Sequence, residues 1–135
     1  MGFKLCLVGA GGHARVVVDA LLENPNCNNF EEIFLTDEDC SRREGIDLRV
    51  ISLSEAYKSS THFHICIGNN AVRSEVAKKF LERGIKPWSI WSATSLISKT
   101  ALIQHGVFVA SGAVVAANTR IGQFAIINHL TSVDH

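Results

Sequence analysis

The chain has 135 residues, 47% of them apolar and 19% charged, and its 13 basic side chains balance 13 acidic ones. These values fit one globular domain, or one domain and part of a second, and the neutral balance gives no reason to expect nucleic acid as a partner. No apolar run approaches the ~20 residues that a membrane-spanning helix needs, so we expect no membrane insertion.

The N-terminus and the cysteines indicate the compartment. The first residues, MGFKLCLVGAGG, are too short and too glycine-broken for a signal peptide. The four cysteines, Cys6, Cys27, Cys40 and Cys66, are scattered and form no C-x-x-C pair, which favours reduced, buried thiols over disulfides or a metal site. We therefore expect a cytoplasmic protein without a bound metal.

In chain order, the first two-thirds alternate strand and helix patterns. The sequence predicts strands over 3–8, 32–36 and 62–67, and helices over 12–22 and 71–83. Alternation of this kind is typical of a parallel sheet whose ligands bind at the carboxyl ends of the strands. Three segments each follow one of these strands: Gly9–His13, Asp37 and Gly68–Asn70. We therefore expect them to meet at the carboxyl edge of the sheet.

The glycine-rich segment after the first strand favours phosphate binding. Gly9, Gly11 and Ala14 fit the dinucleotide fingerprint G-x-G-x-x-G/A, in which a phosphate approaches backbone amides at a helix N-terminus. His13 can donate a hydrogen bond to a phosphate oxygen, more strongly if it is charged. Asp37 can accept one from a ribose hydroxyl or a base N–H.

A structural interpretation competes at each of these positions. The glycines can be a turn, His13 a surface residue, and Asn70 a helix cap. We favour the cap for Asn70 alone, and nucleotide binding for Gly9–His13 together with Asp37.

Aromatic and imidazole side chains follow in the third strand and after it. His62 and His64 alternate along a strand and share a face, which can suit a metal, but no third ligand is apparent nearby. We expect them to line a sheet face under a helix. Trp88 and Trp91 are expected to pack in the core or at a domain junction.

The last forty residues have a period of six. The first position of seven successive hexads is always β-branched and aliphatic: Ile97, Ile103, Val109, Val115, Ile121, Ile127 and Val133. The fifth position is always small. This period is that of the hexapeptide form of a parallel β-helix, in which three hexads complete one triangular coil and the aliphatic side chains fill its axis. The sequence therefore predicts two domains, residues 1–91 and 92–135.

Four motifs together resemble one family: GAGGHA (9–14), FLTD (34–37), IGNN (67–70) and INHLTSVDH (127–135). The family is that of bacterial sugar acetyltransferases of the left-handed β-helix class, which includes sialic acid O-acetyltransferases and nucleotide-amino-sugar N-acetyltransferases. The resemblance implies an α/β Rossmann-like domain with a parallel sheet, followed by the start of a left-handed parallel β-helix. It also implies a homotrimer with active sites between subunits.

The same resemblance implies an activity and its residues. The expected reaction is acetyl transfer from acetyl-CoA to a nucleotide-linked amino sugar or a sialic acid, in surface-glycan biosynthesis. His135 matches the general base of the family and Asn128 the polar residue beside it. The residues implied for the nucleotide sugar are Gly9, Gly11, Gly12, His13, Asp37, Gly68 and Asn69.

The chain departs from the family pattern in three places. Thr36-Asp37 stands where two acids are frequent, and His129 follows Asn128 where a small residue is usual, which adds a second imidazole. The hexads make little more than two coils, and the later coils, the coenzyme A groove and the acid that usually follows the base are absent. We therefore expect the chain to be the front part of a longer enzyme.

Two other functions compete with acetyl transfer. A nucleotide-sugar-binding module without catalysis would also need the α/β domain. An NAD-dependent oxidoreductase would explain the fingerprint at Gly9, but the hexads have no part in hydride transfer, and the α/β unit is short for a full dinucleotide fold.

Overall fold

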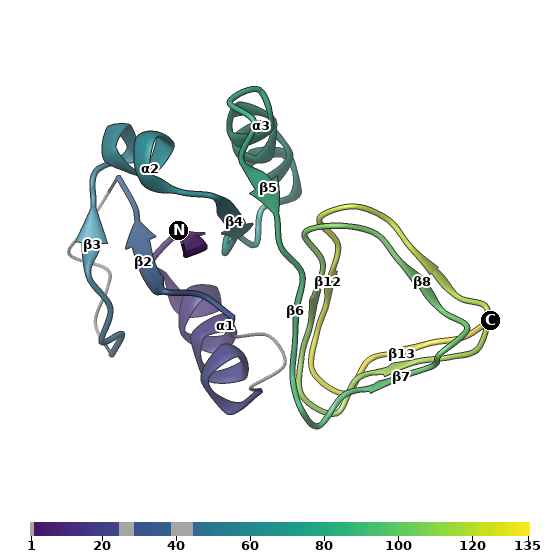
Figure 1. The fold of residues 1–135 in the computed structure, drawn as a ribbon. Coiled ribbons are helices and arrows are strands. Elements are labelled where there is room, and N and C mark those ends of the chain that lie inside the picture. Colours follow the sequence, from purple (N-terminus) through teal and green to yellow (C-terminus); the bar gives the residue numbers. More distant parts are fainter. Residues whose placement is uncertain (1, 25–28, 39–44) are drawn as a thin grey trace.

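The computed structural model describes residues 2–24, 29–38 and 45–135. Its N-terminal part is a parallel sheet with helices on both faces, and its C-terminal part is a triangular coil (Figure 1). The sheet strands are β1 (Lys4–Val8), β2 (Glu32–Thr36), β3 (Val50–Ile51), β4 (His62–Ile65) and β5 (Lys86–Pro87). The helices are α1 (Gly12–Glu23), α2 (Leu53–Ser59) and α3 (Asn70–Leu81).

The order of the strands defines where a ligand would bind. The sheet runs β3-β2-β1-β4-β5, and all of its neighbouring strands pair in parallel. The chain builds outward from β1 through β2 to β3 and then crosses to the other side of β1 to lay down β4. In open parallel sheets such a switch point opens a crevice at the carboxyl ends of the two central strands, here β1 and β4.

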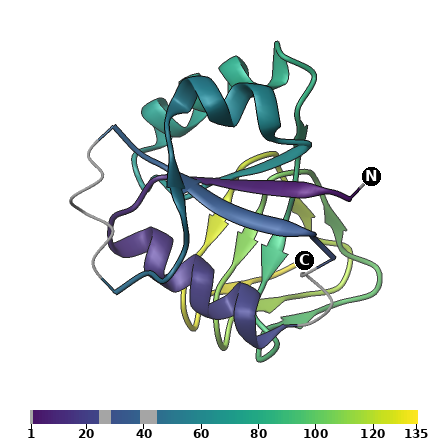
Figure 2. The ribbon, with the colours of Figure 1, turned by 60° about the vertical axis from the view of Figure 1, so that its left-hand side comes forward.

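The sheet is buried on both faces, as Figure 2 shows with α1 below it and α2 and α3 above. Because side chains alternate along a strand, Leu5 and Leu7 pack toward α1, whereas Cys6 packs in the core beneath α2 and α3 with Phe34 and Phe63. Double burial explains why these strands read as continuous apolar runs. Each fully buried large side chain contributes about 1.5–3 kcal/mol.

The C-terminal part is a stack of two-residue strands. They are β6 (Ile90–Trp91), β7 (Leu96–Ile97), β8 (Leu102–Ile103), β9 (Phe108–Val109), β10 (Val114–Val115), β11 (Arg120–Ile121), β12 (Ile126–Ile127) and β13 (Ser132–Val133). They form three walls, β6-β9-β12, β7-β10-β13 and β8-β11. Ile97 pairs with Val115 and Val115 with Val133, so the pairing repeats every three hexads and confirms the predicted coil.

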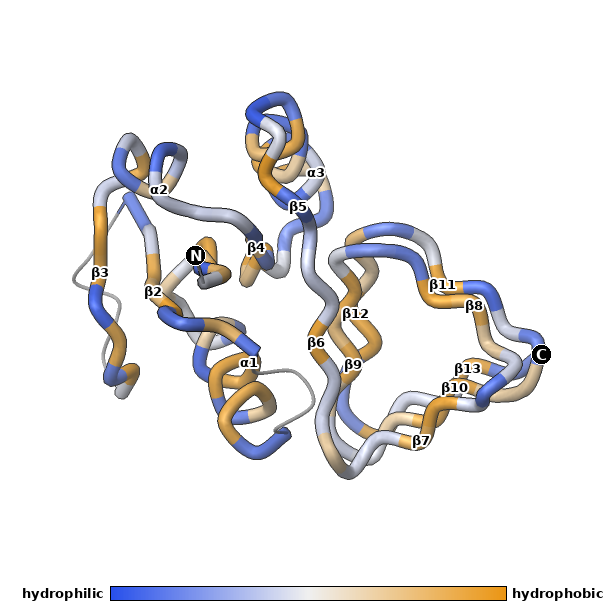
Figure 3. Tube along the Cα trace, viewed as in Figure 1, coloured by the Kyte–Doolittle hydropathy of each residue, from blue (hydrophilic) through white to orange (hydrophobic). Residues whose placement is uncertain are grey.

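One wall of the triangle packs against the α/β part. The residue before each inward aliphatic points outward, and its burial depends on its wall. Ile90 and Phe108, on the wall that faces α1, are 0% and 1% exposed, whereas Leu96 and Leu102, on the other two walls, are 69% and 61% exposed. Figure 3 shows apolar residues along these walls and mainly polar ones at the corner near the C-terminus.

The corners have a feature that the hexad pattern did not predict. Five fourth positions have φ between +57° and +74°: Gly106, Gly112, Asn118, Phe124 and Leu130. Glycine and asparagine tolerate this left-handed region, but a bulky residue there costs of order 1–3 kcal/mol. Stacking places Phe124 over Gly106 and Leu130 over Gly112, where a Cβ on either glycine would collide with the side chain above it.

Three elements of the α/β part were not predicted. α2, β3 and β5 are short, and their sequences show too few periodic residues to distinguish them from loops. The third predicted strand ends at Ile65 rather than 67, and the helix after it begins at Asn70. Its cap is Asn69 rather than Asn70, because the Asn69 side chain accepts a hydrogen bond from the Val72 amide at 3.0 Å.

The remaining structural expectations are mostly confirmed. His62 and His64 are buried in the sheet as expected, but their rings pack against residues outside the helices: His62 against Trp88, with centroids 5.3 Å apart, and His64 against Phe108 of the β-helix, with centroids 6.2 Å apart. Trp88 and Trp91 pack against the core beside α1. Cys6 and Cys66 are buried free thiols, while Cys27 and Cys40 lie outside the described residues.

Among the described residues, no helix has both the length and the apolar character to cross a bilayer.

Candidate functional site

The glycine-rich turn after β1 is held by the backbone. The Gly9 amide donates to the Thr36 carbonyl at 2.8 Å. Gly9 has φ +118°, and a Cβ on it would lie 2.8 Å from the Cys66 carbonyl oxygen. Only glycine fits here, because both the conformation and the close approach of the next strand exclude a side chain.

The other glycines of this edge are open. A Cβ on Gly11, Gly12 or Gly68 would meet no heavy atom within 4 Å, so packing does not require glycine there. Gly11 is the N-cap of α1, which therefore has no side-chain cap, and no acidic residue lies in the first turn of α1. Bare glycines at an uncapped helix start leave room for an anion to reach the amides.

Asp37 lies at the same edge and has a partner there. Its Oδ2 accepts a hydrogen bond from the Ala10 amide at 2.7 Å. The carboxylate thus holds the glycine turn in place, a role that the sequence did not reveal. Its contact with a nucleoside stays a prediction.

His13 lies between the two parts of the chain. Its ring packs edge-on against Phe108, with centroids 5.3 Å apart. Burial, with the nearby positive charges of Arg73 and His129, lowers the pKa of His13 from 6.5. The ring is therefore predominantly neutral at pH 7 in the ligand-free chain, and one ring N–H can donate to a phosphate oxygen. Its Nε2 is buried and has no hydrogen-bond partner within the described part.

His64 is a second imidazole at this junction. Its Nδ1 donates to the Trp88 carbonyl at 2.7 Å. Burial lowers the pKa of His64 to about 4, against the opposing effect of that hydrogen bond. The neutral ring leaves Nε2 as an acceptor, which is buried and finds no donor among the described residues. Sequence reasoning placed this residue in the sheet but did not predict its proximity to His13.

Arg73 was not identified from the sequence as a residue of this site. Its guanidinium is buried beside the loop that follows β4, where it donates to the carbonyls of Ile67 and Gly68 at 3.0 Å each. The only sequence signal was an arginine on the otherwise apolar face of α3.

His135 and Asn128 lie elsewhere. The His135 side chain is 79% exposed, and its Nδ1 lies 2.8 Å from Asp134 Oδ1. This hydrogen bond lowers the pKa of Asp134. His135 lies at the corner of the triangle farthest from the sheet (Figure 1), so one chain does not bring it to the glycine turn. Asn128 lies one corner earlier and accepts from the His129 amide at 2.9 Å.

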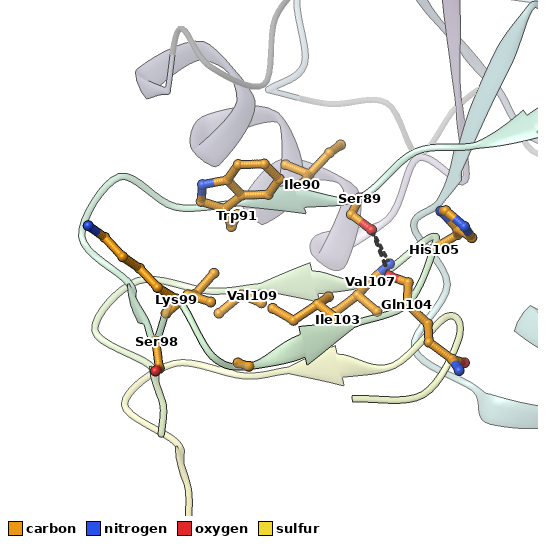
Figure 4. Close-up of a pocket in the computed structure, with 12 residues that line it drawn as sticks. Ser89, Ile90, Trp91, Ser98, Lys99, Ile103, Gln104, His105, Val107 and Val109 are labelled. Carbon is orange, nitrogen blue, oxygen red and sulfur yellow. Dashed lines mark hydrogen bonds between the residues drawn. The ribbon is translucent and has the colours of Figure 1, made fainter. Parts of the chain in front are cut away.

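Hollows are present at two other places in the structure. A cavity of about 480 Å³ opens at the first coil of the β-helix, where Trp91, Ile97 and Ile103 line it together with the polar Lys99 and His105 (Figure 4). A smaller hollow of about 140 Å³ lies between α1 and His129, with Asp19 and Glu23 along it. None of the predicted nucleotide-sugar residues lines either hollow. The glycine turn stays the candidate site because Gly11 and Gly12 are open and the start of α1 has no side-chain cap. Across the described ranges, no group of three or more His, Cys, Asp or Glu side chains is arranged to hold a metal.

These features define the class of the protein: a Rossmann-like α/β domain followed by the start of a left-handed β-helix of hexapeptide repeats. Residues 4–80 match the family described as the PglD N-terminal domain. Because the match covers more than half of the chain, the protein belongs to this family.

Solved structures share the fold over the whole chain. The acetyltransferase domain of PglB from Neisseria gonorrhoeae, in complex with acetyl coenzyme A, is 26% identical with a TM-score of 0.86 over 100% of this chain. PerB from Caulobacter crescentus, in complex with CoA and GDP-perosamine, is 24% identical with a TM-score of 0.83 over 98% of it. This chain spans 66% of the length of the solved PglB domain and 63% of the solved PerB chain.

Proposed function

We propose that the protein transfers an acetyl group from acetyl-CoA to the amine of a nucleotide-linked sugar. The observation that carries this proposal is the open, uncapped glycine turn at the switch point of the sheet, joined to a β-helix that is shared with an acetyl-CoA-bound acetyltransferase domain. The complex of PerB with GDP-perosamine supports a nucleotide amino sugar as the acceptor, in preference to a sialic acid. Such a product would serve surface-glycan biosynthesis.

The α/β part would hold the nucleotide sugar. Amides of the first turn of α1, left open by Gly11 and Gly12, would bind its diphosphate, with His13 as a hydrogen-bond donor. Asp37 and Asn69 would border the nucleoside end of the same crevice, and Gly9 and Gly68 would keep its floor clear. We assign this role to residues 1–91, and the start of the acyltransferase part to residues 92–135.

The β-helix would supply the base. Nδ1 of His135 donates to Asp134 at 2.8 Å, so that Nε2 of the neutral ring would be the atom that takes a proton from the attacking amine. The amine would attack the thioester carbonyl and pass its proton to Nε2. The C–S bond would then break, and the departing sulfur would take that proton from the imidazolium, so that coenzyme A leaves as the thiol. A backbone amide would stabilise the tetrahedral oxyanion. Asn128 would be a polar contact for the acceptor near the base.

A homotrimer would bring the two halves of the site together. One chain places His135 at the corner remote from its own glycine turn, so a neighbouring subunit must provide one of them. Leu96, Leu102 and Leu130 expose apolar side chains on the outer walls and at a corner, where a second β-helix could cover them. The buried thiols Cys6 and Cys66 fit a reducing compartment, and we place the protein in the cytoplasm.

An acetyl-transfer assay tests the proposal. The full-length protein is incubated with acetyl-CoA and a panel of UDP-, dTDP- and GDP-linked amino sugars, while a thiol reagent follows the release of coenzyme A. We expect release with at least one amino sugar, none with the matching hydroxyl sugars, and loss of activity in His135→Asn. Release that is equally fast without an amine, or that His135→Asn leaves unchanged, would overturn it.

A further inference from the structure

Arg73 joins two parts of the molecule that are far apart in sequence. Its Nη1 donates to the carbonyls of Ile67 and Gly68 at 3.0 Å each, and its Nη2 donates to Asn70 Oδ1 at 2.7 Å. Its Nε donates to the carbonyl of Phe124 at 2.7 Å. The first three bonds hold the loop after β4, and the fourth holds a corner of the β-helix.

The corner at Phe124 is itself tightly determined. Phe124 has φ +59°, its amide donates to the His105 carbonyl at 3.0 Å, and its ring stacks on Phe63 with centroids 6.0 Å apart. The ring also covers Gly106 of the coil below. A bulky residue in this conformation persists only where its surroundings fix it. Arg73 therefore bonds to a rigid point.

The guanidinium is buried among neutral acceptors. Arg73 is 8% exposed, and its four bonds go to three carbonyl oxygens and one amide oxygen. Within the described ranges, no carboxylate forms an ion pair with it. A planar fork with several donors in fixed directions suits this arrangement, and the ammonium of a lysine cannot reproduce it.

We propose that Arg73 is a positioning residue for the nucleotide-sugar site: it fixes the Ile67–Asn70 segment, which follows β4 at the edge of the crevice, to the β-helix corner at Phe124. The role of the crevice rests on the function proposed above. The four hydrogen bonds of Arg73, which we call the bridge, do not depend on that function, because they are present in the ligand-free chain.

Arg73→Lys tests the bridge directly because it keeps the positive charge and removes the planar guanidinium with its several N–H donors. Arg83→Lys is the matched control, since Arg83 is an exposed arginine just beyond the far end of α3. Its contacts, with the Lys79 carbonyl and with the face of the Tyr57 ring, involve neither the loop after β4 nor the corner at Phe124. Asn70→Ala removes one acceptor and leaves the arginine in place. It serves as the second variant should Arg73→Lys fold poorly.

Hydrogen exchange of the ligand-free, full-length protein is the first measurement. In Arg73→Lys we expect the amides of Val72, Arg73 and Phe124 to exchange about tenfold faster, while amides of β8 and β11 keep their rates. Arg83→Lys should leave all of them unchanged. Faster exchange at Val72 and Arg73 without any change at Phe124 would contradict the bridge.

Calorimetric titration with UDP, dTDP and GDP is the second measurement. For the nucleotide that the wild type binds, we expect Arg73→Lys to weaken affinity about tenfold and Asn70→Ala about threefold, with less than additive loss in the double variant. Wild-type affinity in Arg73→Lys would overturn the positioning role. Absence of wild-type binding to every nucleotide would instead overturn the proposed function, and the exchange rates would still decide the bridge.

Discussion

His64 shows how burial sets the chemistry of a single residue. Its side chain is almost wholly enclosed, its Nδ1 is committed to the Trp88 carbonyl, and the pKa of the ring falls to about 4. The ring is therefore neutral wherever the chain is folded near pH 7. His13, which also packs against Phe108, experiences the same effect more weakly, because it is only half-buried.

This burial predicts a dependence of stability on pH. Between pH 6.5 and about 4 the unfolded chain binds a proton at His64 and the folded chain does not, so the stability that is present above pH 6.5 is lost as pH falls. Taken over that whole interval, the loss is about 3 kcal/mol. His64→Asn, whose amide can still donate to the Trp88 carbonyl, should remove this part of the pH dependence.

Urea unfolding of both proteins at pH 7 and pH 4 measures the effect. Because the pKa of His13 and that of His62 are also lowered by burial, a smaller decline should remain in the variant. Equal declines in wild type and variant would contradict the account of His64.

The β-helix corners predict a second effect at the scale of a residue. A Cβ on Gly106 would collide with the Phe124 ring, and φ there is +74°. Gly106→Ala should therefore lower the free energy of unfolding by about 2 kcal/mol. Gly122→Ala is the control, because its Cβ would meet nothing within 4 Å and φ is not positive. If denaturant unfolding shows equal losses for the two variants, stacking over Gly106 does not constrain the corner.

At the scale of an element, α3 begins at a cap that belongs to the candidate site. Asn69 accepts from the Val72 amide, and Asn70 accepts from Arg73, so both side chains already have structural partners. The sequence expectation assigned the cap to Asn70 and the ligand to Asn69. The structure gives the cap to Asn69, and a ligand contact there would be additional.

Two substitutions separate these roles of Asn69. Asn69→Ala should cost about 1 kcal/mol of stability through loss of the cap, and Asn69→Ser should restore it. If Asn69 also touches the nucleotide sugar, the serine variant will keep the weaker affinity of the alanine variant. Thermal unfolding measures the stability of each variant, and calorimetric titration of the same samples measures its affinity for the nucleotide sugar. Full recovery of affinity in the serine variant would show that Asn69 acts only as the helix cap.

How much of the fold could be read from the sequence depended on the element. The hexads and the β1-to-α1 turn were predictable, because stacking demands an inward aliphatic at every sixth residue and a tight turn demands Gly9. α2, β3 and β5 were not, since seven residues or fewer show no clear period. The hydrogen bond from Arg73 to Phe124 joins residues 51 positions apart and depends on tertiary packing alone, so no local sequence pattern predicts it.

At the scale of the whole molecule, the arrangement of the two parts explains the proposed assembly. The α/β part covers the β6-β9-β12 wall and leaves the other two walls exposed, with His135 at the corner between them (Figure 1). A site that uses both the glycine turn and His135 therefore has to be built from two chains. The α/β edge of one subunit would bind the sugar nucleotide, and the corner of a neighbour would supply the base.

Mixed trimers test this central claim most directly. Full-length His13→Ala and His135→Ala proteins are each assayed for acetylation of the amino sugar, then dissociated together, reassembled and assayed again, with wild type treated in the same way. Each variant alone should be nearly inactive. The mixture should regain about a quarter of the wild-type rate, because random assembly pairs an intact glycine turn with an intact base from the neighbouring subunit at that frequency. A mixture as inactive as its parents, beside fully recovered wild type, would contradict a site shared between subunits.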